Sequence, residues 1–196
     1  MTMIQNKKII LGSQSPRRQE LLNQIGIEYD IQVYGVEEIY PTNLSPFNVP
    51  EYLAKLKSDQ FKIEKLENTC VITSDTVVIY DNKILGKPIN KKEALNMILE
   101  LSGKEHYVVT GVCLQFINKR KSFSSVSKVE FETISEAEAN YYINTFDPLD
   151  KAGSYGIQEW IGQTRIKKIS GCYYNIMGLP LNQLYNNLIE EKVITF

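Results

Sequence analysis

The chain has 196 residues, of which 43% are hydrophobic and 23% are charged, and this composition predicts a folded protein with one sizeable core. The 22 Lys and Arg residues are balanced by 23 Asp and Glu, and the pI near 6.0 argues against a nucleic-acid-binding protein. No apolar run is long enough for a signal peptide or a membrane span, so we expect a cytoplasmic protein. Cys70, Cys113 and Cys172 form no paired spacing, which predicts buried thiols. Nothing marks a linker, so residues 1–196 are expected to form a single domain.

Residues 8–26 predict a strand followed by a helix. Ser15 suits an N-cap, Pro16 suits the first helical position, and Gly26 would end the helix. Arg17 and Arg18 follow at once, so their guanidinium groups and the free amides of the helix start would meet a phosphate. Two alternatives remain at this point. The segment would otherwise be a capped amphipathic helix with solvated arginines, or a basic arm for DNA, which the charge balance disfavours.

The next part of the chain alternates between strands and helices. We expect a strand over residues 30–34, a loop over 40–46, and a helix from Pro50 to about residue 66. The apolar side of that helix would carry Leu53, Leu56, Phe61 and Ile63, leaving Lys55, Lys57 and Lys62 on the surface. Residues 70–80 are the most hydrophobic strand candidate and are expected to be central in the sheet.

The second half of the chain continues this alternation. Asn90 and Ser135 each open a capping box for a helix, and Pro180 begins a final helix. Further strands are expected over residues 106–117, 122–134, 165–169 and 172–177, with a turn at 118–121 and an irregular glycine-rich region at 147–162. The whole pattern predicts an α/β fold with a mixed, twisted sheet and flanking helices.

Asp75 interrupts the most hydrophobic strand. A lone carboxylate is costly to bury without a cation, a metal or hydrogen bonds, so we expect it at a strand end or in a cleft. Lys87 follows in a short turn-like segment that would hold its ammonium group over the same cleft. A structural aspartate and an ordinary surface lysine explain these two segments equally well.

Glu37 and Glu38 precede a loop, where adjacent carboxylates are usually solvated. If Glu38 converges with Asp75, the two form an oxygen-ligand site suited to magnesium or manganese, which usually shares its coordination with substrate phosphates. His106 begins an apolar strand, and a structural role is expected for it rather than catalysis.

Residues 147–158 form either a glycine-rich connector or a loop that approaches a ligand. Glycine permits close backbone access, and the amide of Gln158 both donates and accepts hydrogen bonds. The segment taken alone does not decide between these readings.

A series of short segments, spread in order over nearly the whole chain, closely resembles the motifs of the Maf family. These segments are residues 12–22, 74–78, 85–88, 101–103 with His106, 148–153, 155–158 and 178–181. Any one of these motifs is weak, but several at consistent spacing are far more specific.

The resemblance implies a mixed-sheet α/β fold similar to the inosine triphosphatases, with two lobes around a cleft. It implies a nucleoside triphosphate pyrophosphatase that hydrolyses dTTP and UTP, together with modified pyrimidine triphosphates, in the house-cleaning of nucleotide pools. The implied cofactor is a divalent cation, magnesium or manganese, and the implied partners are the nucleotide substrate and a second copy in a homodimer, with no nucleic acid and no membrane. The alternative is a triphosphate-sensing module of cell division with little turnover. Asp75 favours an enzyme, because a binding module needs no carboxylate poised beside a metal.

The resemblance also assigns residues. It implies Asp75 as the proton acceptor and Glu38 as its acidic companion at the metal. The residues that would handle the triphosphate are Ser13, Arg17, Arg18, Lys57 and Lys87. Arg17, Thr76 and Gln158 match the branch acting on dTTP and UTP rather than the branch acting on 7-methyl-GTP. The Gln158 amide would accept from pyrimidine N3–H and donate to O4, an edge that thymine and uracil share and cytosine lacks.

Three positions depart from the family pattern. Gly12 stands where alanine is frequent, and Asp147 stands where glutamate is usual; both changes are expected to be conservative. Glu159 stands where glycine commonly follows the glutamine, and it adds bulk and charge beside Gln158. That change bears on nucleotide choice rather than on reaction type.

Overall fold

The computed structural model describes residues 2–62, 64 and 67–196, and within it the chain divides into two compact units. The first unit comprises the residues up to Asp75 together with Thr110–Ser125 and Gly178–Phe196, and the second comprises Thr76–Val109 and Val126–Met177. The boundary between them falls within three long strands, β4 (Thr69–Tyr80), β6 (Glu105–Gln115) and β7 (Arg120–Phe131). In these described ranges no helix is long and apolar enough to cross a membrane.

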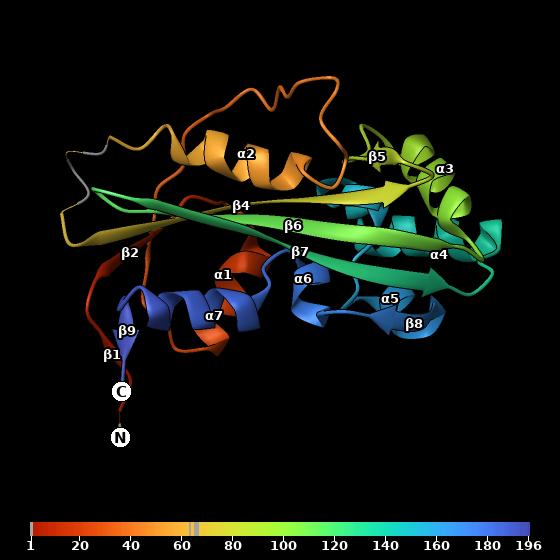
Figure 1. The fold of residues 1–196 in the computed structure, drawn as a ribbon. Helices are drawn as coiled ribbons and strands as arrows, with labels where there is room; N and C mark the ends of the chain where they lie inside the picture. Colours follow the sequence, from red (N-terminus) through yellow and green to blue (C-terminus); the bar gives the residue numbers. More distant parts are fainter. Residues whose placement is uncertain (1, 63, 65–66) are drawn as a thin grey trace. The chain divides into compact units, whose positions relative to one another are not determined.

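The first unit is built on parallel strands near the start of the chain (Figure 1). Strand β2 (Lys8–Leu11) pairs in parallel with β4, with Lys8 opposite Thr69 and Leu11 opposite Ile72, and it also pairs in parallel with the short β3 (Asp30–Ile31). Two terminal strands, β1 (Ile4–Gln5) and β9 (Ile194–Thr195), pair with each other in antiparallel register. The helices of this unit are α1 (Pro16–Gln24), α2 (Val49–Ser58) and α7 (Leu181–Glu190).

Helices of the first unit cover both faces of its strands, and Figure 1 shows α2 on one face with α1 and α7 on the other. Strand β4 is therefore buried on both faces over residues 69–75, which explains its nearly continuous hydrophobic sequence. Its side chains alternate between the two faces, and the Thr73 hydroxyl donates to the Ala54 carbonyl of α2 at 2.7 Å.

The predicted helix over residues 50–66 is shorter in the structure, because α2 ends at Ser58. Phe61 leaves the helical path and is buried against Ile10 and Val71, and the edge of Tyr34 packs on its ring. This packing favours ending the helix early. Ile63 and Leu66, which were predicted to lie in the same helix, fall outside the described residues. The predicted strand over residues 30–34 is confirmed only at Asp30–Ile31.

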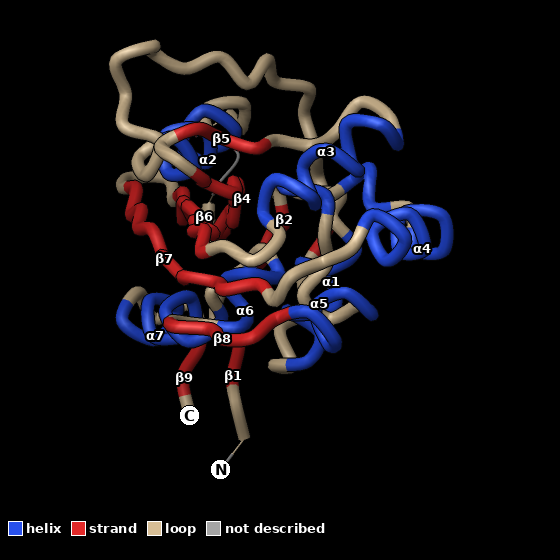
Figure 2. The backbone as a smooth tube through the Cα atoms, turned by 90° about the vertical axis from the view of Figure 1, so that its right-hand side faces the viewer, coloured by secondary structure: helices blue, strands red, loops and turns tan. Residues whose placement is uncertain are grey.

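The second unit combines antiparallel strand pairs with helices α3 (Lys91–Leu101) and α4 (Glu136–Phe146), which lie next to each other in Figure 2. Strand β5 (Lys83–Leu85) pairs with β4, and β8 (Ile166–Ser170) pairs with β7, both in antiparallel register. Together with the parallel pairs of the first unit, these confirm the predicted mixed sheet, whose strand order is β3-β2-β4-β6-β7-β8 with β5 beside β4. The core of this unit is a cluster that includes Phe131, Tyr142 and Ile98.

The capping box predicted at Ser135 is confirmed, whereas the one at Asn90 is half formed, because the Glu93 carboxylate accepts from the Ile89 amide. One short strand was wrong. Ser135 and Glu138 form the full capping box that begins α4, and Asn90 accepts from the Glu93 amide at the start of α3. Residues 172–177, expected as a strand, instead form helix α6 (Tyr173–Met177). A short aromatic and aliphatic run does not distinguish a strand from a buried helical turn. The expected irregular region holds two 3-10 turns, Pro148–Asp150 and Ala152–Ser154, and the start of α5 (Trp160–Arg165).

Gly111 of β6 lies directly against the first turn of α2, and it supplies a stability prediction. A Cβ atom at this position would lie 2.2 Å from the Glu51 amide nitrogen and 2.3 Å from the Pro50 carbonyl carbon. These are backbone atoms, so the helix would have to move. We expect Gly111→Ala to lower the free energy of unfolding by about 2 kcal/mol or more in urea titrations.

The matched control is Gly35→Ala, because a Cβ there meets no atom within 4 Å. That change should alter the unfolding free energy by less than about 1 kcal/mol. Equal effects of the two substitutions would contradict the close approach of α2 to β6.

Candidate active site

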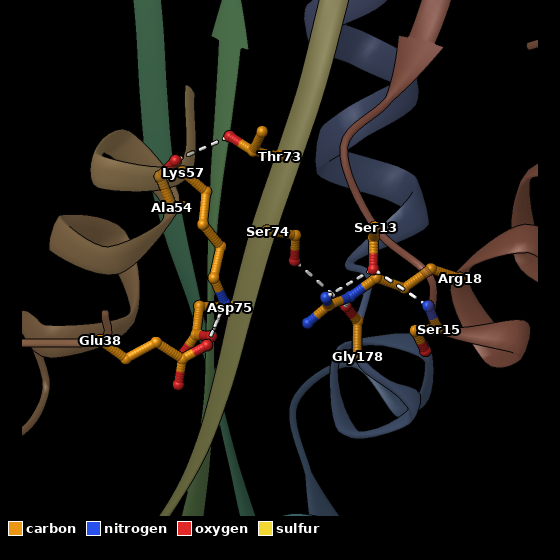
Figure 3. A network of polar contacts seen from close by, with 10 residues as sticks. All are labelled: Ser13, Ser15, Arg18, Glu38, Ala54, Lys57, Thr73, Ser74, Asp75 and Gly178. Atoms are coloured by element: carbon orange, nitrogen blue, oxygen red, sulfur yellow. Dashed lines mark hydrogen bonds and ion pairs between the residues drawn. The ribbon is translucent and has the colours of Figure 1, made fainter. Parts of the chain in front are cut away.

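Asp75 lies in the middle of β4 rather than at a strand end, and a lysine compensates its buried charge. Its side chain is only 11% exposed, and the Lys57 Nζ lies 2.5 Å from Asp75 Oδ1. The same Nζ lies 2.8 Å from Glu38 Oε1, which comes from the loop before α2. Figure 3 shows the three side chains converging on one side of β4. We call Glu38, Lys57 and Asp75 the carboxylate–lysine cluster.

The helical periodicity that predicted Lys57 on the surface was wrong. Lys57 belongs to the last turn of α2, and its side chain is 20% exposed. Since Thr73 also contacts α2, residues 73 and 75 face the helix, and the ammonium group meets Asp75 on that face. Two carboxylates share one ammonium group in the cluster, so its formal charge is −1. Its unshared ligand atoms are carboxylate oxygens, which bind hard cations.

A second set of contacts fixes the Ser-Pro-Arg-Arg segment. Arg18 Nη1 donates to Ser13 Oγ at 3.1 Å, and Arg18 Nε donates to the Gly178 carbonyl at 2.9 Å. Ser13 Oγ also accepts from the Ser15 amide at 3.2 Å. Ser15 is the N-cap residue of α1, as predicted, but its side chain makes no capping hydrogen bond. Figure 3 shows these residues on the side of β4 opposite to Lys57.

Ser74 and Gly178 are contributors to this site that the sequence predictions did not assign. The buried Ser74 hydroxyl donates to the Gly178 carbonyl at 3.3 Å, so this carbonyl accepts from both Ser74 and Arg18. Gly178 has a φ of +110°, which favours glycine. The available signals were a polar residue beside Asp75 in an apolar strand and a glycine just before the Leu-Pro that leads into the final helix.

The charges of Arg17, Asp75 and Glu38 all act on Arg18. Burial lowers the pKa of Arg18 from its usual value, and the neighbouring Arg17 lowers it further. The charges of Asp75 and Glu38 act in the opposite direction. Two arginines and the carboxylate–lysine cluster therefore share one electrostatic environment, in which an anion and a cation would each find opposite charge.

The remaining predicted site residues belong to the second unit. Thr76 directly follows Asp75 in β4, and Lys87 is exposed after β5. Gln158 is half-buried between the 3-10 turns and α5, and its Oε1 is buried with no hydrogen-bond partner in the part of the chain that is described. An unsatisfied buried acceptor is costly unless a ligand supplies its donor.

His106 supports the segment that carries Gln158. His106 Nε2 and the Tyr155 hydroxyl lie 2.7 Å apart, and both side chains are buried with Phe131. Burial lowers the pKa of His106 to about 3. The predicted structural role of this histidine is consistent with a neutral, enclosed imidazole.

Two of the three departures from the family pattern are explained by local geometry. A Cβ on Gly12 would lie 2.7 Å from Thr73 Cγ2, so alanine would not fit here without a shift of the Thr73 side chain. Asp147 ends α4 with a φ of +44°, a left-handed conformation that short polar side chains tolerate better than long ones. The third departure, Glu159, contacts Lys151 and Tyr142.

Fold and site together define an α/β protein that places a buried acid, a lysine and an arginine-bearing helix start in one charged region. The family model for Maf-like protein matches residues 8–191, so the chain belongs to the Maf-like family. Among similar proteins is the dTTP/UTP pyrophosphatase of Bacteroides thetaiotaomicron, 46% identical over 92% of this chain and 94% of the relative. The dTTP/UTP pyrophosphatase of Porphyromonas gingivalis is 47% identical over 92% of each chain.

The architecture is also similar to a solved structure, that of the Staphylococcus aureus Ham1 protein. The TM-score is 0.54, and the match covers 94% of this chain and 100% of that one. At 18% identity this likeness shows the fold alone. It agrees with the predicted α/β fold with a mixed sheet and flanking helices.

The buried His106 predicts a pH dependence of stability. The unfolded chain binds a proton at histidine near its usual pKa of 6.5, whereas the folded chain does so only near pH 3. Stability contributed at this position is therefore intact above pH 6.5 and falls by about 1.4 kcal/mol per pH unit below it. Urea titrations at pH 7 and 5 should show this loss, and His106→Gln should reduce it.

Since His106 is the only histidine, its imidazole NMR signal gives a direct check. The signal of the folded protein should not titrate between pH 8 and 5. A midpoint near 6.5 in protein that stays folded would contradict the enclosed imidazole.

Proposed function

We propose that this protein hydrolyses dTTP and UTP between the α and β phosphates, releasing the nucleoside monophosphate and pyrophosphate. The observation that carries the proposal is the buried Asp75, held in mid-strand by Lys57 beside Glu38, in a chain similar to proteins named dTTP/UTP pyrophosphatase. A module that only binds triphosphates has no evident use for such a costly carboxylate.

Asp75 would act as the general base. A water oxygen attacks the α phosphorus, Asp75 accepts its proton, and the bond from the α phosphorus to the bridging oxygen breaks as pyrophosphate leaves. The contact with Lys57 holds the Asp75 carboxylate in one orientation. Glu38, with its more exposed side chain, would be the acidic companion.

The basic residues would hold the triphosphate and neutralise the charge on departing pyrophosphate. Arg18 is fixed in orientation by Ser13 and Gly178, so its guanidinium plane is preorganised for phosphate oxygens. Arg17 and Lys57 would add charge around the same group, and the family resemblance also assigns Lys87 to the triphosphate. Ser13 would supply a hydroxyl from the loop that precedes α1.

Glu38 and Asp75 would also hold a magnesium or manganese ion. Their oxygens already converge on one cationic group, Lys57 Nζ, and carboxylates are the ligands these ions prefer. The described residues contain no cluster of three or more histidine, cysteine, aspartate or glutamate side chains suited to a metal, so phosphate and water oxygens would complete the coordination. When bound, the ion would polarise the phosphate oxygens.

Gln158 would recognise the base. Gln158 offers a buried, unpartnered amide oxygen, and its amide would accept from pyrimidine N3–H and donate to O4. Thr76 and Arg17 would complete the nucleotide preference. Thymine and uracil share the N3–H and O4 pattern, which suits activity on both dTTP and UTP.

Asp75→Asn should abolish most of the pyrophosphate release. The amide preserves the shape of the side chain but does not take the proton from water, so we expect kcat to fall by about 100-fold or more with dTTP. The measurement is a pyrophosphate assay on purified protein with dTTP, UTP and CTP, each with magnesium, manganese or EDTA.

The control is Asp81→Asn, which removes a carboxylate of the same type from an exposed turn. It should leave kcat unchanged. Full activity of Asp75→Asn would exclude the base assignment, and no pyrophosphate from any nucleotide would favour a triphosphate-sensing module.

Gln158→Glu should change which base is preferred. A carboxylate accepts hydrogen bonds but does not donate to O4, whereas it accepts from the exocyclic amine of cytosine. We expect the ratio of kcat/KM for UTP to that for CTP to fall by about tenfold or more.

An exposed glutamine in α7, Gln183, supplies the control substitution Gln183→Glu. Its nucleotide ratios should equal those of the unaltered protein. Equal ratios for Gln158→Glu as well would remove the argument for recognition through the amide.

A further inference from the structure

Glu159 connects three segments of the second unit through its carboxylate. Its Oε1 lies 3.2 Å from the Lys151 ammonium nitrogen, and its Oε2 accepts from the Tyr142 hydroxyl of α4. The same Tyr142 oxygen accepts from the Gly156 amide at 2.9 Å. The carboxylate of Glu159 is thus the centre of a network that returns to its own loop at Gly156.

The network is enclosed, and the ammonium group of Lys151 partly compensates its charge. Tyr142 is fully buried, Lys151 is 7% exposed, and the Glu159 side chain is 19% exposed. Burial and the neighbouring Glu159 raise the pKa of Tyr142, so its hydroxyl stays protonated and remains a donor. Lys151 Nζ also lies 2.7 Å from Asp150 Oδ1, so two carboxylates share its ammonium group, and Glu159 is not an isolated anion beside Gln158.

The fit around Gly156 is close. A Cβ at that position would lie 2.6 Å from Glu159 Cδ and 2.7 Å from Glu159 Oε2. The Glu159 side chain therefore folds directly over the Gly156 backbone. The Glu159 amide also donates to the Gly156 carbonyl at 3.1 Å, which closes the loop on itself.

Two further contacts hold this loop on either side of Gln158. Tyr155 is paired with His106, and the Gln158 carbonyl accepts from Gln163 Nε2 at 2.8 Å. In the described chain, the Gln158 side-chain oxygen is the member of this loop that is buried without a partner. The loop is held in place while one acceptor is left for a ligand.

We propose that Glu159 is a positioning residue that determines nucleotide specificity. It acts through the loop, by fixing the backbone from which the Gln158 amide reads the pyrimidine edge, and it does not touch the reacting phosphates. The inference rests on the proposed pyrophosphatase function. Preorganisation of the amide lowers the cost of matching one hydrogen-bonding pattern and rejecting another.

The test compares Glu159→Ala with Lys151→Met and the double variant. Glu159→Ala should lower the ratio of kcat/KM for UTP to that for CTP by about tenfold, through KM rather than kcat. Lys151→Met should lower it less. The double variant should lower it no further than Glu159→Ala does, because Lys151 contacts this loop through Glu159 and its other partner is Asp150.

A second readout does not depend on turnover. Hydrogen exchange of the Gly156 amide should accelerate by about tenfold or more in Glu159→Ala, because its acceptor Tyr142 loses its own partner. Glu100→Ala removes an exposed glutamate from α3 and should change neither readout.

The outcomes separate the two claims. If the unaltered protein releases pyrophosphate and Glu159→Ala keeps its nucleotide ratio, the inference is overturned even if the melting temperature falls. A faster exchange of Gly156 together with a lower ratio supports it. An unaltered protein without pyrophosphatase activity would instead refute the proposed function.

Discussion

The ion pair between Lys57 and Asp75 is the interaction on which the site depends. A carboxylate in a strand that is covered on both faces is unstable without compensation, and here one ammonium group compensates both Asp75 and Glu38. That ammonium group reaches the strand only because α2 packs closely on β6, where Gly111 leaves room for the helix backbone. The position of α2 therefore determines both the packing of the core and the contacts of Lys57 in the first unit.

Much of the fold could be predicted because its signals are local. The hydrophobic run of β4, the capping box at Ser135 and the helix start at Pro16 each depend on neighbouring residues, and all three were confirmed. The end of α2 and the helix at Tyr173–Met177 were missed, because tertiary packing decides them. Phe61, for example, is buried by residues distant in sequence.

The candidate site also combines residues that the sequence predicted with contacts that it did not. Residue type and motif order singled out Asp75, Arg18 and Gln158 and paired Asp75 with Glu38, but they did not show that Lys57 contacts Asp75 or what holds Arg18. The Gly178 carbonyl accepts from both Ser74 and Arg18 and so orients the guanidinium group. Arg18 and Gly178 are 160 positions apart in the chain. Periodicity placed Lys57 on the surface because a helical wheel does not record that a long side chain can cross to a buried acid.

The alternation of side chains in β4 has a consequence for how this sequence can vary. Thr73 and Asp75 face α2, while Ser74 faces the Gly178 carbonyl. Inserting or deleting a single residue between Thr69 and Thr73 would exchange these faces, presenting a serine to Lys57 and a carboxylate to the Gly178 carbonyl. Spacing along this strand is therefore under tighter constraint than most of the residues it contains, and gaps in it should be far rarer than substitutions.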